Sequence, residues 1–342
     1  METATYTFHP KPPYNFFYML QRLMYARHEL YRFESDHSVI RTLNIRQSEI
    51  SQQGGSGGPS SDKPWKRVLT CTTWNKNVWE PVLRVDVVLE EGTEPLTAAE
   101  DRWLRKLLAH IWMVDVDLMP FYRQMSEERP IAPLLQLLEG YRPPLDGSLF
   151  ECMVKTIIGQ QLNLAFARKL NERLCQLAAP PLVWRDVAYP VFPEPEELAA
   201  LNAEQLMAMK FSQRKAEYVL DFSRGVSRKE IPWPTLEEAL KKPDEEFFQE
   251  WLTIRGVGVW TVECVLIFGL GRPDLLPAAD VGLRNAVKKV YRLYDKPTEE
   301  EMRKIGRAWK PWSSFVTAYL WESLVHYPNI HRTNSVDTFR IV

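Results

Sequence analysis

The sequence predicts an α+β protein in which a mixed α/β sheet part, residues 1–112, precedes an all-α region, residues 113–342. Runs rich in β-branched residues occur before about residue 110, whereas apolar residues at helical spacing dominate from about residue 113. The 342 residues are 45% apolar and 25% charged, which is typical of a folded globular protein and excludes disorder for most of the chain. No repeat of fixed period appears.

Two segments of the sheet part have the pattern of strands. Residues 68–74 and 82–89 are β-branched and partly alternating, as expected for strands that are buried on one face. Residues 53–61 between the earlier strands and this pair are rich in Gly and Ser, so we expect a flexible surface loop there. Thr97 then begins a helix, because Thr97 and Glu100 have the spacing of a capping box.

Apolar periodicity predicts a series of helices in the second region. They are expected near residues 149–158, 164–177, 198–209, 213–225, 236–241, 281–291, 299–308 and 313–324. Residues 251–270 are expected to form two helices that are split by Gly256-Val257-Gly258. Prolines between residues 180 and 195 predict a loop.

The overall charge hides a local imbalance. The chain has 43 Lys and Arg against 44 Asp and Glu, so its net charge of −1 excludes the simplest signal of nucleic-acid binding, a basic whole chain. Residues 255–310, however, hold 11 basic against 7 acidic residues, and the remainder is acidic. The sequence therefore predicts a basic side that faces nucleic acid and an acidic back.

Cysteines and hydropathy indicate a reducing compartment. The four cysteines are widely spaced and form no CxxC pair, so we expect no zinc site, no iron–sulfur cluster and no disulfide framework. No window of eighteen apolar residues and no secretory signal is visible. We expect a protein of the reducing cytoplasm, without a cysteine-bound metal and without membrane contact.

The stretch 252–263 is the most informative one. Gly256 and Gly258 allow a sharp turn with uncovered N–H groups, and the helix that follows adds its partial positive charge. Together these groups would cradle one phosphate. Taken alone, G-x-G is more typical of an ordinary turn between helices. A dinucleotide fingerprint is excluded because a helix precedes the turn and no third Gly follows at the right spacing.

Asp280 is the second signal. It lies immediately before a predicted helix, so the simplest interpretation is an N-cap. A capping carboxylate beside a cleft can also be the reactive group, since the two roles are compatible.

Four motifs in this order resemble the helix–hairpin–helix DNA glycosylase superfamily. They are LTIRGVG at residues 252–258, PAAD at 277–280, IIGQQLNLA at 157–165 and KPWSSFVTAYLW at 310–321. The last is similar to the corresponding segment of the bacterial 3-methyladenine DNA glycosylases. The resemblance covers roughly residues 115–327 and implies a helical core of two subdomains with its hairpin at residues 252–263. Residues 1–110 resemble that family's N-terminal sheet domain in order and size.

The resemblance implies that Asp280 is the catalytic carboxylate of an enzyme that removes damaged bases from double-stranded DNA by base flipping. Superfamily members with lyase activity carry Lys two residues after the second hairpin glycine, where this chain has Trp260. We therefore expect hydrolysis of the N-glycosidic bond without strand nicking. Lys288 and Lys289 are expected to face solvent or phosphate.

The base pocket and the DNA contacts are implied in the same way. Trp260 and Trp321 are expected to stack on cationic alkylated purines such as 3-methyladenine and 7-methylguanine. The family's tyrosines are replaced by Cys264 and Val281, which leaves the substrate range open. Gln161 matches the residue that fills the gap left by the flipped base.

The hairpin residues Arg255, Gly256, Val257 and Gly258 are expected to contact phosphate. Arg255 departs from the Pro that is usual at its position. The resemblance also implies a structural monovalent or divalent cation at the hairpin, with no other cofactor. The clustered cysteines of the endonuclease-type branch are absent.

Three alternatives stay open. The weakest is a helical interaction protein, which absent DNA affinity at low salt would favour. An 8-oxoguanine-type glycosylase is disfavoured by the missing Lys, and a non-catalytic helix–hairpin–helix module that senses damaged DNA is disfavoured by Asp280.

Overall fold

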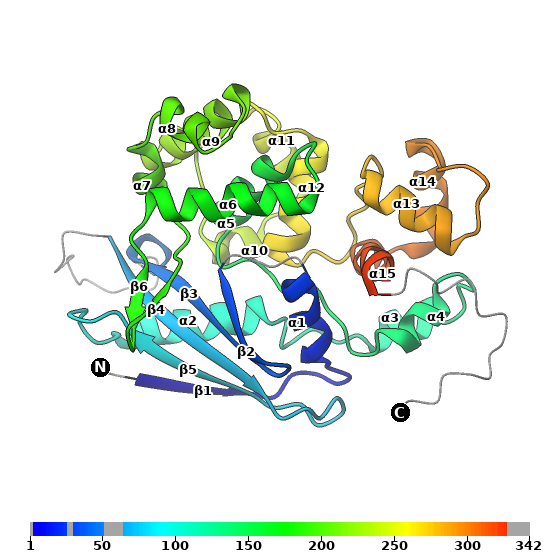
Figure 1. Cartoon of the computed structure of the whole chain (residues 1–342). Coiled ribbons are helices and arrows are strands. Elements are labelled where there is room, and N and C mark those ends of the chain that lie inside the picture. Colours follow the sequence, from blue (N-terminus) through cyan, green and yellow to red (C-terminus); the bar gives the residue numbers. More distant parts are fainter. Residues whose placement is uncertain (1–2, 26–29, 51–63, 327–342) are drawn as a thin grey trace.

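A computed structural model describes residues 3–25, 30–50 and 64–326 (Figure 1). Its N-terminal part is a five-stranded antiparallel sheet in the order β1-β5-β4-β3-β2. The strands are β1 (Thr3–Phe8), β2 (Tyr31–Ser35), β3 (Ser38–Arg46), β4 (Trp65–Trp74) and β5 (Leu83–Leu89). The predicted strands thus exist, and the loop expected at residues 53–61 lies outside the described residues.

The two faces of the sheet are covered by different elements. One face packs against α1 (Phe16–Tyr25) and α2 (Ala98–Ile111). The other face packs against a small hairpin formed by β6 (Leu182–Trp184) and β7 (Val187–Tyr189). Alternation along β3 supplies both cores, since Val39 joins the first and Ile40 the second.

Helices beyond the sheet form two groups (Figure 1). The first group contains α5 (Leu149–Gly159), α6 (Leu164–Ala178), α7 (Pro195–Ala199), α8 (Ala203–Ala208), α9 (Gln213–Ser227), α10 (Leu236–Lys241), α11 (Asp244–Trp251) and α12 (Val259–Leu270). The second group contains α3 (Met119–Met125), α4 (Ala132–Leu137), α13 (Val281–Val290), α14 (Glu299–Ile305), the 3₁₀ turn η3 (Gly306–Trp309) and α15 (Ser313–His326). A second 3₁₀ turn, η1 (Gln47–Glu49), follows β3.

Most predicted elements are confirmed, including the capping box of Thr97 and Glu100 at the start of α2. Three expectations were wrong. Of the two helices expected within residues 251–270, the first ends already at Trp251, because α11 spans Asp244–Trp251 and a turn follows it. The predicted loop at residues 180–195 contains β6 and β7, which Arg185 and Asp186 join through backbone with positive φ. The predicted helix at 198–209 is two helices, because Asn202 begins α8 with its own capping box.

One buried apolar cluster runs from Tyr6 in β1 to Leu320 in α15. It therefore joins the sheet part to both groups of helices, and the domain boundary at residues 112 and 113 stays a prediction. Among the described residues, no helix is long and apolar enough to cross a membrane.

Candidate active site

Asp280 is the N-cap of α13, and its carboxylate accepts three N–H groups. Oδ1 accepts from the backbone of Leu283 at 2.6 Å and from Trp321 Nε1 at 3.0 Å, while Oδ2 accepts from Trp260 Nε1 at 3.2 Å. The N-cap interpretation is therefore confirmed. Hydrogen bonds to both oxygens fix the orientation of the carboxylate before any substrate arrives.

Trp260 and Trp321 reach Asp280 from different helices. Trp260 lies in the first turn of α12, in the first group of helices, and Trp321 lies in α15, in the second group. Both side chains are partly exposed, and Phe268 of α12 stacks on Trp321 with ring centroids 5.7 Å apart. The structure thus brings together the three residues that sequence reasoning assigned to catalysis and base binding, at the junction of the two groups.

The two positions where the family's tyrosines are replaced differ in environment. Cys264 is buried beside Asp280, and burial, followed by the negative charge of Asp280, raises the pKa of its thiol well above the ordinary range. Cys264 is therefore a neutral thiol and not a nucleophile. Val281, by contrast, is 55% exposed.

Gly282 is a site residue that sequence reasoning missed, and Arg22 packs behind the site, against Phe268. A Cβ on Gly282 would lie 3.1 Å from Asp280 Oδ1 and 3.5 Å from Trp321 Nε1, so only Gly fits there without disturbing the carboxylate. A small residue two positions after Asp280 is the sequence signal that could have identified Gly282. Arg22 of α1 pairs with Glu322 and lies 5.3 Å from the Phe268 ring centroid. Nothing in the local sequence around Arg22 indicated this contact.

The hairpin joins α11 to α12. Gly256 has φ +87°, and a Cβ there would lie 2.4 Å from the Tyr218 ring, so the left-handed backbone and the close approach both require Gly. Gly258 is the N-cap of α12, and a Cβ there would meet nothing within 4 Å. The structure therefore explains Gly256 by packing within the protein, whereas Gly258 faces open space in front of a helix N-terminus.

Arg255 forms ion pairs within the protein. Its guanidinium donates to Asp221 at 2.7 Å and to Glu217 at 2.6 Å, both on α9, and lies over the Tyr218 ring. These contacts hold the hairpin against α9. Val257, the remaining hairpin residue, is buried. A phosphate contact by Arg255 remains a prediction, and it would have to compete with two carboxylates.

Gln161 lies at the end of α5, on the same side as the hairpin. It is exposed and has φ +55°, and its neighbour Gln160 donates to the Gly256 carbonyl at 2.7 Å and to Thr261 Oγ1 at 2.9 Å. Gln161 is therefore not a buried amide. Its proposed role in the DNA gap stays a prediction.

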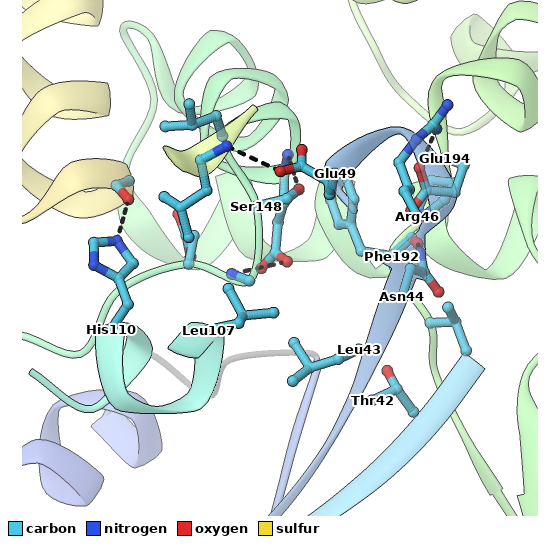
Figure 2. A pocket seen from close by; sticks show the side chains of 18 of the residues that line it. Thr42, Leu43, Asn44, Arg46, Glu49, Leu107, His110, Ser148, Phe192 and Glu194 are labelled. Atoms are coloured by element: carbon cyan, nitrogen blue, oxygen red, sulfur yellow. Dashed lines mark hydrogen bonds and ion pairs between the residues drawn. The ribbon is translucent and has the colours of Figure 1, made fainter. Parts of the chain in front are cut away.

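A separate cavity lies between the sheet part and the first group of helices (Figure 2). Its walls include Glu49, His110 and Glu194, and burial raises the pKa of Glu49 to about 7. Asp280, Trp260 and Trp321 are absent from its walls, so this cavity is distinct from the candidate active site. Among the described residues, no three His, Cys, Asp or Glu side chains are grouped to hold a metal.

Comparisons with known proteins identify the family of this chain. The model of the HhH-GPD superfamily of base excision DNA repair proteins matches residues 154–311. A putative DNA-3-methyladenine glycosylase, YfjP of Bacillus subtilis, is 42% identical over 182 residues, which are 53% of this chain and 60% of that relative. A second relative from B. subtilis, a DNA-3-methyladenine glycosylase, is 32% identical over 229 residues, 66% of this chain and 74% of the relative.

A solved structure shares the fold over nearly the whole chain. The 3-methyladenine DNA glycosylase from Archaeoglobus fulgidus superposes with a TM-score of 0.71 at 21% identity, covering 93% of this chain and 97% of that one. The motif order, the fold and the sequence matches agree. The chain therefore belongs to the HhH-GPD superfamily of base excision DNA repair proteins, in the branch of the 3-methyladenine (AlkA-like) DNA glycosylases.

Proposed function

We propose that this protein is a monofunctional DNA glycosylase that excises alkylated purines of the 3-methyladenine and 7-methylguanine type in base excision repair. The observation that carries the proposal is the Asp280 carboxylate, held by three N–H donors between the indole rings of Trp260 and Trp321. The activity named for its relatives supports the same conclusion.

The proposed reaction breaks the bond between deoxyribose C1′ and the base nitrogen. The base leaves with the bonding electrons, positive charge develops on the sugar, and the Asp280 carboxylate stabilises that charge while water adds to C1′ and releases a proton to the solvent. A cationic alkylated purine leaves as a neutral molecule, so its departure needs no general acid. A single fixed carboxylate therefore suffices for these substrates, whereas a neutral undamaged purine would leave as a poorly stabilised anion.

Selectivity for cationic bases follows from the walls of the site. Aromatic faces attract cations and electron-poor rings, with a contribution of about 1–2 kcal/mol for a good contact. Trp260 and Trp321 supply two such rings, and the smaller Cys264 and Val281 stand where the family has tyrosines. This arrangement supports a broad pocket that depends on the weakened glycosidic bond of alkylated purines.

DNA binding is proposed through the hairpin. The open space in front of Gly258 and the N-terminus of α12 would receive one phosphate, and Gln161 would fill the gap left by the flipped base. We further propose that the protein acts as a monomer on DNA in the bacterial cytoplasm. It would carry no cofactor apart from a cation at the hairpin.

Hydrolysis without lyase activity follows from the residue at position 260. A lyase in this superfamily uses a Lys at that place to form a covalent Schiff base with the sugar. Trp260 has no amine, and Lys288 and Lys289 are exposed on α13, opposite its buried face. Borohydride treatment of the protein on lesion DNA is therefore expected to trap no covalent complex. Trapping that a Lys substitution abolishes would instead favour an 8-oxoguanine-type enzyme.

The deciding experiment measures release of free base from duplex DNA that contains 7-methylguanine or 3-methyladenine. Asp280→Asn keeps an N-cap and should fold, yet base release should fall by about 10²–10³, as when one electrostatic group is removed from a site. Asp295→Asn removes one exposed carboxylate after α13 and should retain wild-type release. Near-normal release by Asp280→Asn would show that another group supports the chemistry.

A further inference from the structure

We infer that Arg22 is a positioning residue for base excision, which holds the indole of Trp321 in place from the N-terminal part of the chain. Arg22 lies in α1, which packs on the five-stranded sheet, whereas Trp321 lies in α15. The link between them is indirect and passes through Glu322 and Phe268. This inference rests on the proposed function, because Trp321 is assigned to the site of that reaction.

The first link is the ion pair between Arg22 and Glu322, which lie 300 residues apart in the sequence. Glu322 directly follows Trp321 in α15, and its side chain is only 2% exposed. A buried carboxylate is costly unless a cation and hydrogen bonds replace the lost water. The Arg22 guanidinium donates to Glu322 Oε1, and the hydroxyl of Tyr141 donates to the same oxygen at 3.4 Å. Because successive side chains of a helix point about 100° apart around its axis, the contacts that fix Glu322 also fix the direction of Trp321.

The second link is a stack of a cation and two aromatic rings. The Arg22 guanidinium lies 5.3 Å from the ring centroid of Phe268. Phe268 stacks on Trp321, with centroids 5.7 Å apart and an angle of 23° between the ring planes. Both kinds of contact depend on the relative placement of the groups. Since Phe268 belongs to α12 and Glu322 to α15, Arg22 contacts one helix of each group and holds their spacing behind the site.

The consequence of these contacts reaches the reacting carboxylate. Trp321 Nε1 donates to Asp280 Oδ1 at 3.0 Å, so a rotation of α15 would stretch or bend this hydrogen bond. Hydrogen bonds to a charged group are strong, and they weaken steeply when their geometry is poor. Asp280 stabilises the positive charge of the transition state in the proposed reaction. Arg22 therefore acts on the chemical step through Trp321, whereas DNA binding depends on the hairpin.

Four variants test this role. Arg22→Met removes the guanidinium but keeps a long side chain, and Arg22→Lys keeps a cation. The double variant Arg22→Met/Glu322→Gln removes both charges, so it separates positioning from the cost of burying Glu322 without Arg22. The matched control is Arg105→Met, because Arg105 of α2 lies 5.0 Å from the Phe8 ring centroid within the sheet part. The measurements are single-turnover release of 7-methylguanine, affinity for a duplex with a tetrahydrofuran abasic site, and thermal unfolding.

Arg22→Met should release methylated base about tenfold more slowly, because the hydrogen bond from Trp321 to Asp280 is weakened, while affinity for the abasic duplex stays unchanged. Its unfolding temperature should fall, since Glu322 remains buried without the guanidinium. Arg22→Met/Glu322→Gln should regain the unfolding temperature but remain slow. Arg22→Lys should regain most of the rate, and Arg105→Met should match wild type.

A combination with Trp321→Phe shows whether Arg22 acts through Trp321. If it does, Arg22→Met added to Trp321→Phe should slow release by less than about twofold, because residues of one network do not contribute additively. A further tenfold loss in this combination would overturn the inference, and so would wild-type release by Arg22→Met/Glu322→Gln. Wild-type release by Arg22→Met beside an active wild type overturns only this inference, whereas no release by wild type overturns the proposed function as well.

Discussion

Substitution of Gly258 separates binding of phosphate from stability of the fold. Gly258 has φ −115° and ψ 177°, a conformation that any residue adopts, and a Cβ there would meet no protein atom within 4 Å. Gly258→Ala should therefore lower the free energy of unfolding by less than about 1 kcal/mol, the difference between Gly and Ala at an N-cap. The added methyl group would instead occupy the space that a phosphate must enter.

The expected loss of binding follows from that one contact. Loss of a phosphate held by backbone N–H groups should weaken binding of lesion duplex at least tenfold, which is about 1.4 kcal/mol. The slope of log affinity against log salt should become shallower by about 1. Titrations of labelled duplex at several salt concentrations measure both quantities, and chemical denaturation measures stability.

Gly256→Ala is the matched control. Its φ of +87° and its Cβ position 2.4 Å from Tyr218 predict a loss of about 2–4 kcal/mol in stability from strain and overlap. Gly256→Ala should thus be unstable, whereas Gly258→Ala should be stable but defective in binding. Wild-type affinity and salt slope in Gly258→Ala would refute a phosphate site in front of α12.

Two further predictions concern α12 and α15. Trp321→Phe keeps a ring that stacks on Phe268 but removes the N–H that Trp321 donates to Asp280. Single-turnover base release should fall about tenfold, because a hydrogen bond to a charged group contributes roughly that much. Affinity for abasic duplex should stay unchanged. An equal fall in affinity would contradict this role. Burial raises the pKa of Glu263 from 4.5 to about 7, so the folded protein retains a proton that the unfolded chain loses, and stability should fall as the pH rises from 4.5 to 7. Glu263→Gln should remove this pH dependence of stability and raise the free energy of unfolding at pH 8 by up to about 3 kcal/mol relative to wild type. Denaturation curves whose stability changes equally with pH in both proteins would disprove this prediction.

Sequence reasoning succeeded where local chemistry dominates. The capping box at Thr97 and the cap at Asp280 depend on residues three positions apart, and both are present as expected. Apolar periodicity located the helices for the same reason. The motif order also led to Asp280, Trp260 and Trp321, although only the structure brings these three side chains into contact.

Contacts between distant segments could not be predicted in this way. The β6–β7 hairpin is too short for a clear alternating pattern, and it is stabilised by packing on Ile40 and Leu69 of the sheet. The sequence around Arg255 does not reveal whether its guanidinium contacts phosphate or the two carboxylates of α9. Lys215 likewise gave no local signal, because its three carbonyl partners lie more than fifty residues earlier.

The indole hydrogen bonds on Asp280 have a mechanical consequence. Trp321 and Asp280 belong to the second group of helices, whereas Trp260 belongs to the first. The Trp260–Asp280 hydrogen bond therefore links the two groups. Relative movement of the two groups would break that bond together with the Phe268–Trp321 stack, so the site is complete only when the groups keep this spacing. Substitutions at the contact between the groups would then reduce turnover without touching Asp280.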